Sequence, residues 1–344
     1  MSSKTLRAYS FCLAGLLVVV TSAGAEASSW RFLSPSTASA VVVAATSKGS
    51  IIVLPTMTGP AVKMGGPGTV AVNTRGNIVY AAPEWGRRTG QLLTLSLTGR
   101  RLKELSSVRL GGTGAVSIAV APDAKSLVVA NYSTSSVSVV RLDARGIPME
   151  VTTIATPTVP SAPHAVAFFG ENVVLTDLRN DRLELLSIVG KPRWLGSIAM
   201  RSGDGPRSIA VLNDRQLVVS NELANSVSCF VSDRGSLIER GRVELGGGAG
   251  PKAPKPADIV ATSETSGAVV VRGPDELIRF SVRADCQLEV TNREFDVVDS
   301  PRPLVRRGPE IWMGISTAVM VSAVGDNWGA IPTQDPVYAM VVVR

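Results

Sequence analysis

Residues 127–140 have the sequence LVVANYSTSSVSVV, and the same plan returns as VVLTDLRNDRLELL at 173–186, LVVSNELANSVSCF at 217–230 and VVVRGPDELIRF at 269–280. Each stretch is a β-branched run, then a polar tip, then a second run in which apolar and polar residues alternate. A period of two on both sides of turn-forming residues is typical of a β-hairpin. The four stretches therefore predict four antiparallel hairpins.

Weaker copies extend this repeat over most of the chain. The copies number seven and begin about every 40–50 residues, with the weaker ones at 41–54, 78–95 and 311–321. Most copies have one more short strand before them and another after them, as at 117–122, 164–169, 208–213 and 237–245. Four antiparallel strands at this period are typical of a β-propeller blade.

The repeat decides the fold class. Strands do not alternate with helices as a Rossmann fold or a TIM barrel requires. The sequence predicts an all-β fold, a seven-bladed β-propeller of four-stranded antiparallel blades that forms a single domain over residues 26–344.

The two ends of the repeat indicate how the ring closes. The first copy lacks its leading strand, while VYAMVVV at 337–343 is a strand without a hairpin of its own. We expect this C-terminal strand to complete blade one and so to cover an open sheet edge. The alternative is that it forms the last strand of blade seven.

The N-terminus has the pattern of a secretory signal peptide. Lys4 and Arg7 precede the apolar stretch FCLAGLLVVV, and Ala23-x-Ala25 is a cleavage motif. We expect residues 1–25 to be removed and the protein to be secreted or periplasmic, the alternative being an anchor that stays attached. The mature part has no apolar run long enough to cross a membrane.

Composition indicates a folded protein with a preference for anionic partners. The chain is 45% hydrophobic and 18% charged, and its net charge is +7. Its Lys and Arg residues form no basic block and aromatic residues make up only 5%, so we do not expect it to bind nucleic acid. We expect a monomer.

The cysteines and the single histidine limit metal chemistry. Cleavage would remove Cys12, and because Cys229 and Cys286 fall in different repeats, the sequence favours free thiols over a disulfide. One His and two distant Cys do not supply a structural zinc site. We therefore expect no metal and no cofactor.

His164 is that single histidine, and its position in the repeat points to a site. In an antiparallel meander, residues equidistant from the turn are cross-strand neighbours. Counting from the turn in blade five pairs Arg207 with Glu222, and the same counting in blade four pairs His164 with Asp177. One such pair would be an ordinary rim salt bridge worth about 0–1 kcal/mol, but several at one end of a channel indicate a functional site.

Counting around the ring extends this set. It brings Ser117 opposite Tyr132, puts Thr69 about one hairpin from Glu84, and places Arg272 and Arg302 at the same level. The result is a mixed acid–base set with surplus positive charge. We predict that it binds substrate through Asp177, Arg272, Tyr132 and Glu84.

Four motifs give the chain a family resemblance. They are Pro-His in PHAVAF, Gly-Pro-Arg in GDGPRSIAV, Asn-Glu in VVSNELANSVS and Pro-Arg in SPRPL. With them, ANYSTSSVSVVRLDARGIP resembles the Asn-Tyr blade segment of the seven-bladed lactonase propellers, which include 6-phosphogluconolactonases and fungal 3-carboxy-cis,cis-muconate lactonising enzymes. The resemblance is clearest over residues 116–240. It implies a metal-free active site with His164, Glu222, Arg207 and Arg302 as catalytic residues.

This set fits the opening of a lactone ring in a small anionic substrate. Glu222 or His164 would take a proton from water, while Arg207 and Arg302 would bind a carboxylate or phosphate and stabilise the oxyanion. In a muconate-type reaction the same base would move a proton at carbon. Ser161 lies near His164 in the sequence, but no nucleophile elbow accompanies it.

A second class of function stays open. Propellers are also binding platforms, and a secreted basic one would bind an anionic ligand, a protein or nucleic acid without chemistry. An enzyme needs His164 and Glu222 in one pocket with shifted ionisation. A binding module would tolerate their loss.

Overall fold

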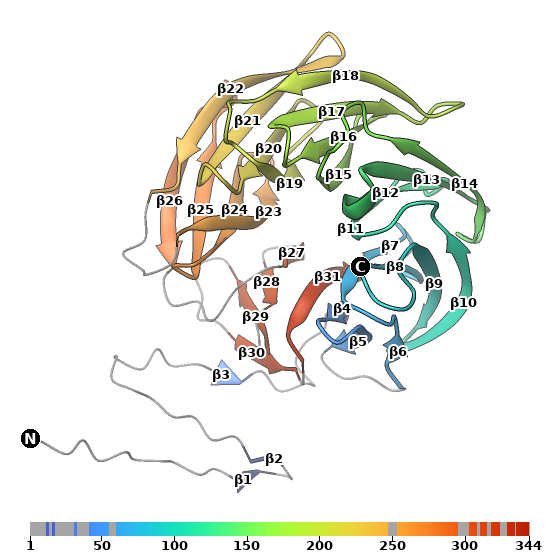
Figure 1. Cartoon of the computed structure of the whole chain (residues 1–344). Helices are drawn as coiled ribbons and strands as arrows, with labels where there is room; N and C mark the ends of the chain where they lie inside the picture. Colours follow the sequence, from blue (N-terminus) through green and yellow to red (C-terminus); the bar gives the residue numbers. More distant parts are fainter. Residues whose placement is uncertain are drawn as a thin grey trace, which may run out of the picture.

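The structure is a computed structural model that describes residues 12–13, 16–17, 31–32, 41–54, 60–246, 253–294, 303–307, 310–314, 318–323, 329–333 and 335–343. Within them, seven antiparallel sheets are arranged in a ring (Figure 1), and the channel at its centre holds a cavity. The predicted all-β, seven-bladed β-propeller is confirmed. The described residues contain one 3₁₀ turn, η1 (Tyr132–Thr134), and no α-helix.

Each blade is a meander of four strands that runs from the channel outward. Blade one contains β31 (Val337–Val343), β4 (Val41–Thr46), β5 (Ser50–Leu54) and β6 (Val62–Lys63). Blade two contains β7 (Gly68–Val72), β8 (Ile78–Pro83), β9 (Gln91–Thr98) and β10 (Arg101–Arg109). Blade three contains β11 (Ala115–Val120), β12 (Ser126–Asn131), β13 (Ser136–Leu142) and β14 (Pro148–Ala155). Blade four contains β15 (Pro163–Phe169), β16 (Asn172–Asp177), β17 (Arg182–Ser187) and β18 (Arg193–Ala199).

The remaining blades follow the same plan. Blade five contains β19 (Pro206–Val211), β20 (Gln216–Asn221), β21 (Ser226–Asp233) and β22 (Ser236–Glu244). Blade six contains β23 (Lys255–Ser263), β24 (Ser266–Arg272), β25 (Glu276–Val282) and β26 (Leu288–Glu294). Blade seven contains β27 (Leu304–Arg307), β28 (Glu310–Gly314), β29 (Ala318–Ala323) and β30 (Gly329–Pro332), with β3 (Arg31–Phe32) added in parallel at its outer edge.

The core lies between the blades. Each cluster of buried apolar side chains joins two neighbouring blades, as Val218 and Cys229 of blade five pack with Val269 and Phe280 of blade six. Second strands such as β20 are buried at every position because a blade covers each of their faces, whereas outer strands such as β10 are mostly exposed. This explains why the second strands have nearly continuous β-branched runs.

The C-terminal strand closes the ring as predicted. β31 pairs antiparallel with β4, from Val337 opposite Thr46 to Val343 opposite Val41. The innermost strands contact one another in the order β31, β7, β11, β15, β19, β23, β27 and back to β31. Blade one is therefore built from both ends of the repeat, and its inner edge is covered.

A β-bulge recurs near the start of the innermost strands. It occurs in β11, β15, β19, β23 and β31. In β19, Pro206 pairs with Asn221 and Ser208 with Ser220, which leaves Arg207 as the extra residue. A bulge turns side chains away from the regular alternation and is common beside active sites. Here it directs consecutive side chains into the channel.

The structure corrects two predicted pairings. Asp177 lies opposite Pro163 rather than His164, because counting from the turn allowed no extra residue in the inner strand. Ser117 lies opposite Ala130 rather than Tyr132. No bulge separates Ser117 from the turn, so this prediction was wrong because the centre of the turn was misplaced by one residue.

The two remaining cysteines form a disulfide, which corrects the expectation of free thiols. Cys229 of β21 is bonded to Cys286 of the β25–β26 turn, with 5.7 Å between their Cα atoms. Neighbouring blades stack face to face, so residues from different repeats meet. Gly241 on β22 makes room, since a Cβ there would overlap the carbonyl oxygen of Cys286.

Most of the predicted signal peptide lies outside the described residues. Within it, β1 (Cys12–Leu13) and β2 (Leu16–Leu17) form a two-stranded sheet. Cleavage near Ala25 stays a prediction, as does the boundary of the mature domain. A search of the described residues finds no helix with the length and apolarity needed to span a membrane.

Candidate functional site

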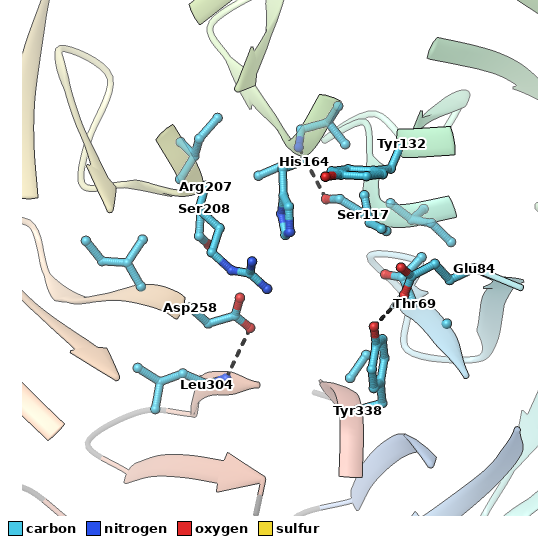
Figure 2. A pocket seen from close by; sticks show the side chains of 18 of the residues that line it. Thr69, Glu84, Ser117, Tyr132, His164, Arg207, Ser208, Asp258, Leu304 and Tyr338 are labelled. Carbon is cyan, nitrogen blue, oxygen red and sulfur yellow. Dashed lines mark hydrogen bonds between the residues drawn. The ribbon is translucent and has the colours of Figure 1, made fainter. Parts of the chain in front are cut away.

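A cavity of about 520 Å³ occupies the channel at the end where the innermost strands begin. Its volume lies in the range of about 300–1,000 Å³ that is usual for small-molecule sites. Figure 2 shows its polar side chains converging from several blades. The polar lining consists of Thr69, Glu84, Ser117, Tyr132, His164, Arg207, Ser208, Glu222, Asp258, Arg272 and Tyr338.

Two positions in the blade plan supply most of this lining. The bulge of the innermost strand supplies residues such as His164, Arg207 and Tyr338. The end of the second strand supplies the others, as Glu222 follows Asn221 and Arg272 ends β24. Blades two to six therefore each present side chains to the cavity at both places.

Hydroxyl groups on the second strands fix the bulges of neighbouring blades to one another. Thr176 accepts a hydrogen bond from the N–H of Ala165 (2.8 Å) and donates one to the carbonyl oxygen of Arg207 in the next blade (3.1 Å). Ser220 is bonded likewise to the N–H of Ser208 (3.3 Å) and the carbonyl oxygen of Ala257 (2.8 Å). Blades four, five and six are thus coupled at the level of the site.

Blades five and six form a positively charged wall. Nη1 of Arg207 lies 2.5 Å from Oε2 of Glu222, and Nη2 of Arg272 lies 2.7 Å from Oε1 of the same carboxylate. The predicted approach of Arg207 to Glu222 is confirmed, and Arg272 joins them. Two guanidinium groups and one carboxylate leave a surplus positive charge. The Nε of Arg207 is buried without a hydrogen-bond partner in the described part of the chain.

The arginines decide the ionisation of Glu222. Burial by itself would raise the pKa of this carboxyl, but the charges and hydrogen bonds of Arg207 and Arg272 outweigh it and hold the pKa below its usual value. Glu222 is therefore an ionised clamp that orients both guanidinium groups. A carboxylate held in this way is a weak base.

His164 faces the same cavity in its neutral form. Burial, and then the positive charges of Arg207 and Arg272, hold the pKa of the imidazole well below its usual 6.5, while hydrogen bonds with backbone oppose this only in part. Its ring lies edge-on to Tyr132, with 6.1 Å between centroids and 85° between planes. Figure 2 shows the two rings together at the wall of the cavity. A neutral imidazole retains a nitrogen lone pair that can take a proton.

Asp177, which we predicted to bind substrate, does not line this cavity. It is completely buried, and its carboxylate accepts hydrogen bonds from the N–H groups of Ala162 (3.0 Å) and Arg179 (3.2 Å) and from Nδ2 of Asn180 (2.7 Å). These contacts join the β16–β17 turn to the start of β15. Asp177 is a structural residue because the bulge places it opposite Pro163.

The other predicted residues have different outcomes. Tyr132, Arg272 and Glu84 line the cavity. Glu84 accepts a hydrogen bond from the hydroxyl of Tyr338, on which Trp85 packs edge-on at 5.9 Å. Arg302 lies outside the described residues, so its role stays a prediction.

Sequence analysis missed three polar lining residues, Asp258, Ser208 and Tyr338. Asp258 accepts a hydrogen bond from the N–H of Leu304 at 3.3 Å. Burial raises the pKa of its carboxyl, and the opposing effects of Arg207, the Leu304 N–H and Arg272 are smaller. Aligning Pro256-Ala257-Asp258 with Pro206-Arg207-Ser208 at the bulges would have revealed the first two.

Metal ligands do not cluster in the described part of the chain, where no three His, Cys, Asp or Glu side chains lie close enough together to hold a metal ion.

Comparison with known proteins identifies one family and many solved structures that share this fold. Residues 37–310 match the family model for the seven-bladed β-propeller lactonases. No curated protein matches the sequence. A periplasmic gluconolactonase from Pseudomonas aeruginosa is similar with a TM-score of 0.77 and 17% identity, over 89% of this chain and 99% of that one.

Two further structures show how widely the fold is shared. A protein from Lactobacillus plantarum has a TM-score of 0.78 at 17% identity, over 89% of this chain and 99% of its own. A virginiamycin B lyase from Staphylococcus aureus has a TM-score of 0.61 at 14% identity, over 79% of this chain and 86% of its own. At such identities the likeness shows the fold alone.

Proposed function

The chain belongs to the family of seven-bladed β-propeller lactonases, and on that premise we propose that it hydrolyses a small lactone that carries an anionic group. The observation that carries this proposal is the Arg207–Glu222–Arg272 cluster beside the neutral His164 in one cavity. Positive charge and a proton acceptor are the two requirements of lactone opening.

Substrate binding begins with the arginines. Guanidinium groups bind carboxylates and phosphates through paired hydrogen bonds. Glu222 holds Arg207 and Arg272 in place, and their surplus charge attracts the anionic group of the substrate. The lactone carbonyl then lies where its developing oxyanion is stabilised by the same charge.

Water attack follows at the carbonyl carbon. The water oxygen forms a bond to this carbon, its proton passes to the free nitrogen of His164, and the carbonyl electrons move onto oxygen. The electrons on this oxygen then re-form the carbonyl as the ring C–O bond breaks, and the ring oxygen takes up a proton to give the hydroxy acid. A positioned base of this kind contributes about 10²–10⁴-fold.

Substrate charge improves the base at the moment of reaction. Arg207 and Arg272 help to depress the pKa of His164 in the free protein. An anion bound beside them offsets their charge and lets this pKa rise. The imidazole is then a stronger base when the lactone is bound than when the cavity is empty.

Two other properties belong to the proposal. We infer a secreted or periplasmic protein, which is supported by the N-terminal sequence and by the Cys229–Cys286 disulfide, since such bonds persist in oxidising compartments. We also infer that the reaction needs no metal, because base and positive charge both come from side chains. The rate should then be unchanged by a chelator.

The test is acid release by the purified chain. Glucono-δ-lactone, its 6-phosphate and muconolactone are followed in a pH-stat, beside Glu222→Gln and the control Glu171→Gln, whose residue is exposed in the β15–β16 turn. We expect turnover of a lactone that Glu222→Gln loses and Glu171→Gln keeps. No acceleration over spontaneous opening on any of the three would overturn the proposal and favour a non-catalytic ligand-binding propeller.

A further inference from the structure

Asp258 is the one carboxyl of the charged wall that the mechanism above does not use. It lies in the bulge of β23, lines the cavity and is partly buried. Its Oδ2 accepts the hydrogen bond from Leu304 N–H. Figure 2 shows Asp258 beside the guanidinium group of Arg207, on the far side of the cavity from Tyr132.

Asp258 and Glu222 share neighbours but differ in ionisation. Both face Arg207 and Arg272, yet the pKa of Glu222 is lowered while burial raises that of Asp258. The difference follows from geometry, since Glu222 forms ion pairs with both arginines and Asp258 is bonded to a backbone N–H. Two carboxyl groups pushed apart in this way typically take opposite acid–base roles.

The groups around Asp258 come from every strand packed against β23. Arg207 lies on β19, Glu222 at the end of β20, Arg272 on β24 and the Leu304 N–H on β27. Protonated Asp258 adds no charge to this set. Once ionised, it is stabilised by the two arginines, so the set favours loss of its proton during a reaction.

We propose that Asp258 is the catalytic acid that protonates the ring oxygen as it leaves, a role that rests on the lactone hydrolysis proposed above. The Asp258 O–H bond breaks and its proton bonds to the ring oxygen as the C–O bond breaks, so an alcohol departs instead of an alkoxide. His164 has meanwhile taken the proton of the attacking water. Transfer of that proton through solvent to Asp258 restores both groups.

The first test varies the leaving group. A thiolate leaves without a proton, so the lactone that the protein opens fastest is compared with the thiolactone of the same acid, in wild type and Asp258→Asn. We expect kcat to fall about 10²–10³-fold for the lactone, which lies within the range of general acid catalysis, and less than about 10-fold for the thiolactone. Asp214→Asn, in the exposed β19–β20 turn, is the control and should change neither.

The second test needs no variant. In wild type, kcat for the lactone should fall at high pH as Asp258 loses its proton, whereas kcat for the thiolactone should not. This measurement decides the matter even where Asp258→Asn fails to fold.

The outcomes separate this inference from the function beneath it. Equal losses on both substrates in Asp258→Asn, or equal high-pH falls in wild type, would overturn the role of Asp258 and leave lactone hydrolysis standing. A wild type that opens no lactone would overturn both.

Discussion

Blades four and five follow the same plan with opposite results. At the bulge, His164 of blade four corresponds to Arg207 of blade five. The second strands end in Asp177 and Asn221, both completely buried, and the residue after them lines the cavity in both blades. Blade four presents an apolar side chain there, Leu178. Blade five presents Glu222.

The comparison shows that two adjacent positions of this repeat have different roles. The last residue of the second strand is structural, and the residue after it lines the cavity. The last residue of the second strand secures a turn, as Asn221 does through bonds of 2.9 Å to both Ser226 and Ser228. The next residue faces the cavity and is free to carry charge. Blade four therefore uses its carboxylate to hold a turn, and blade five uses one to hold arginines.

The largest effect is expected at the bulge of blade five. Arg207→Met removes half of the anion site and should lower kcat/KM by about 10²–10³-fold, as the loss of an oxyanion donor does. Steady-state kinetics on the best lactone measure this, with Arg215→Met in the exposed β19–β20 turn as control. Equal kinetics for the two variants would show that Arg207 of blade five takes no part in the reaction.

The next effect concerns the disulfide, which joins blade five to blade six and has no counterpart in blade four. Leu185 of β17 has the register of Cys229 in β21, but Cys229 is bonded to blade six. Replacing both cysteines by serine should lower the free energy of unfolding by about 2–4 kcal/mol. Urea unfolding with and without reductant tests this. A midpoint that reductant leaves unchanged would contradict it.

A smaller loss of stability is expected from Asp177→Asn. It removes an acceptor from a buried cluster of charge-assisted hydrogen bonds, which should cost about 1.5–3 kcal/mol. The folded variant should keep kcat/KM within a factor of about two, since Asp177 does not line the cavity. Glu222→Gln should show the reverse. Loss of activity without loss of stability in Asp177→Asn would break the comparison.

The smallest effect is a shift in pH dependence. Because the pKa of His164 is lowered, its neutral form persists below pH 6.5, and kcat/KM should fall only at more acidic pH. Arg272→Gln removes one of the charges that depress this pKa, so the acid limb of the profile should move to higher pH. A limb that stays in place would show that another group is the base.

Repeat period and hairpin pattern were sufficient to predict the blades, their number and the closing strand, because all three depend on alternation that is visible in the chain. The approach of Arg207 to Glu222 was predictable because long side chains tolerate a register error of one residue. The contacts of Asp177 were not, since an extra residue in β15 moves a short carboxylate out of the site. Asp258 was missed because it is the second residue after a proline, whereas His164 and Arg207 each follow their proline directly.

The disulfide was missed for a related reason. Sequence separation between Cys229 and Cys286 is 57 residues, and a repeat pattern does not state which faces of two blades meet. That information is in the stacking, and in Gly241, whose lack of a side chain lets the Cys286 turn approach.

The hydroxyl groups of Thr176 and Ser220 have a consequence for how such a propeller diversifies. Each one links the backbone of its own bulge to the backbone of the next. If a blade were replaced by one from a relative that lacks this hydroxyl, the next blade would lose a hydrogen bond to its bulge. A foreign blade five should therefore disturb both of its neighbours, and a chimera that imports blade five alone should be less stable than one that imports blades four to six together.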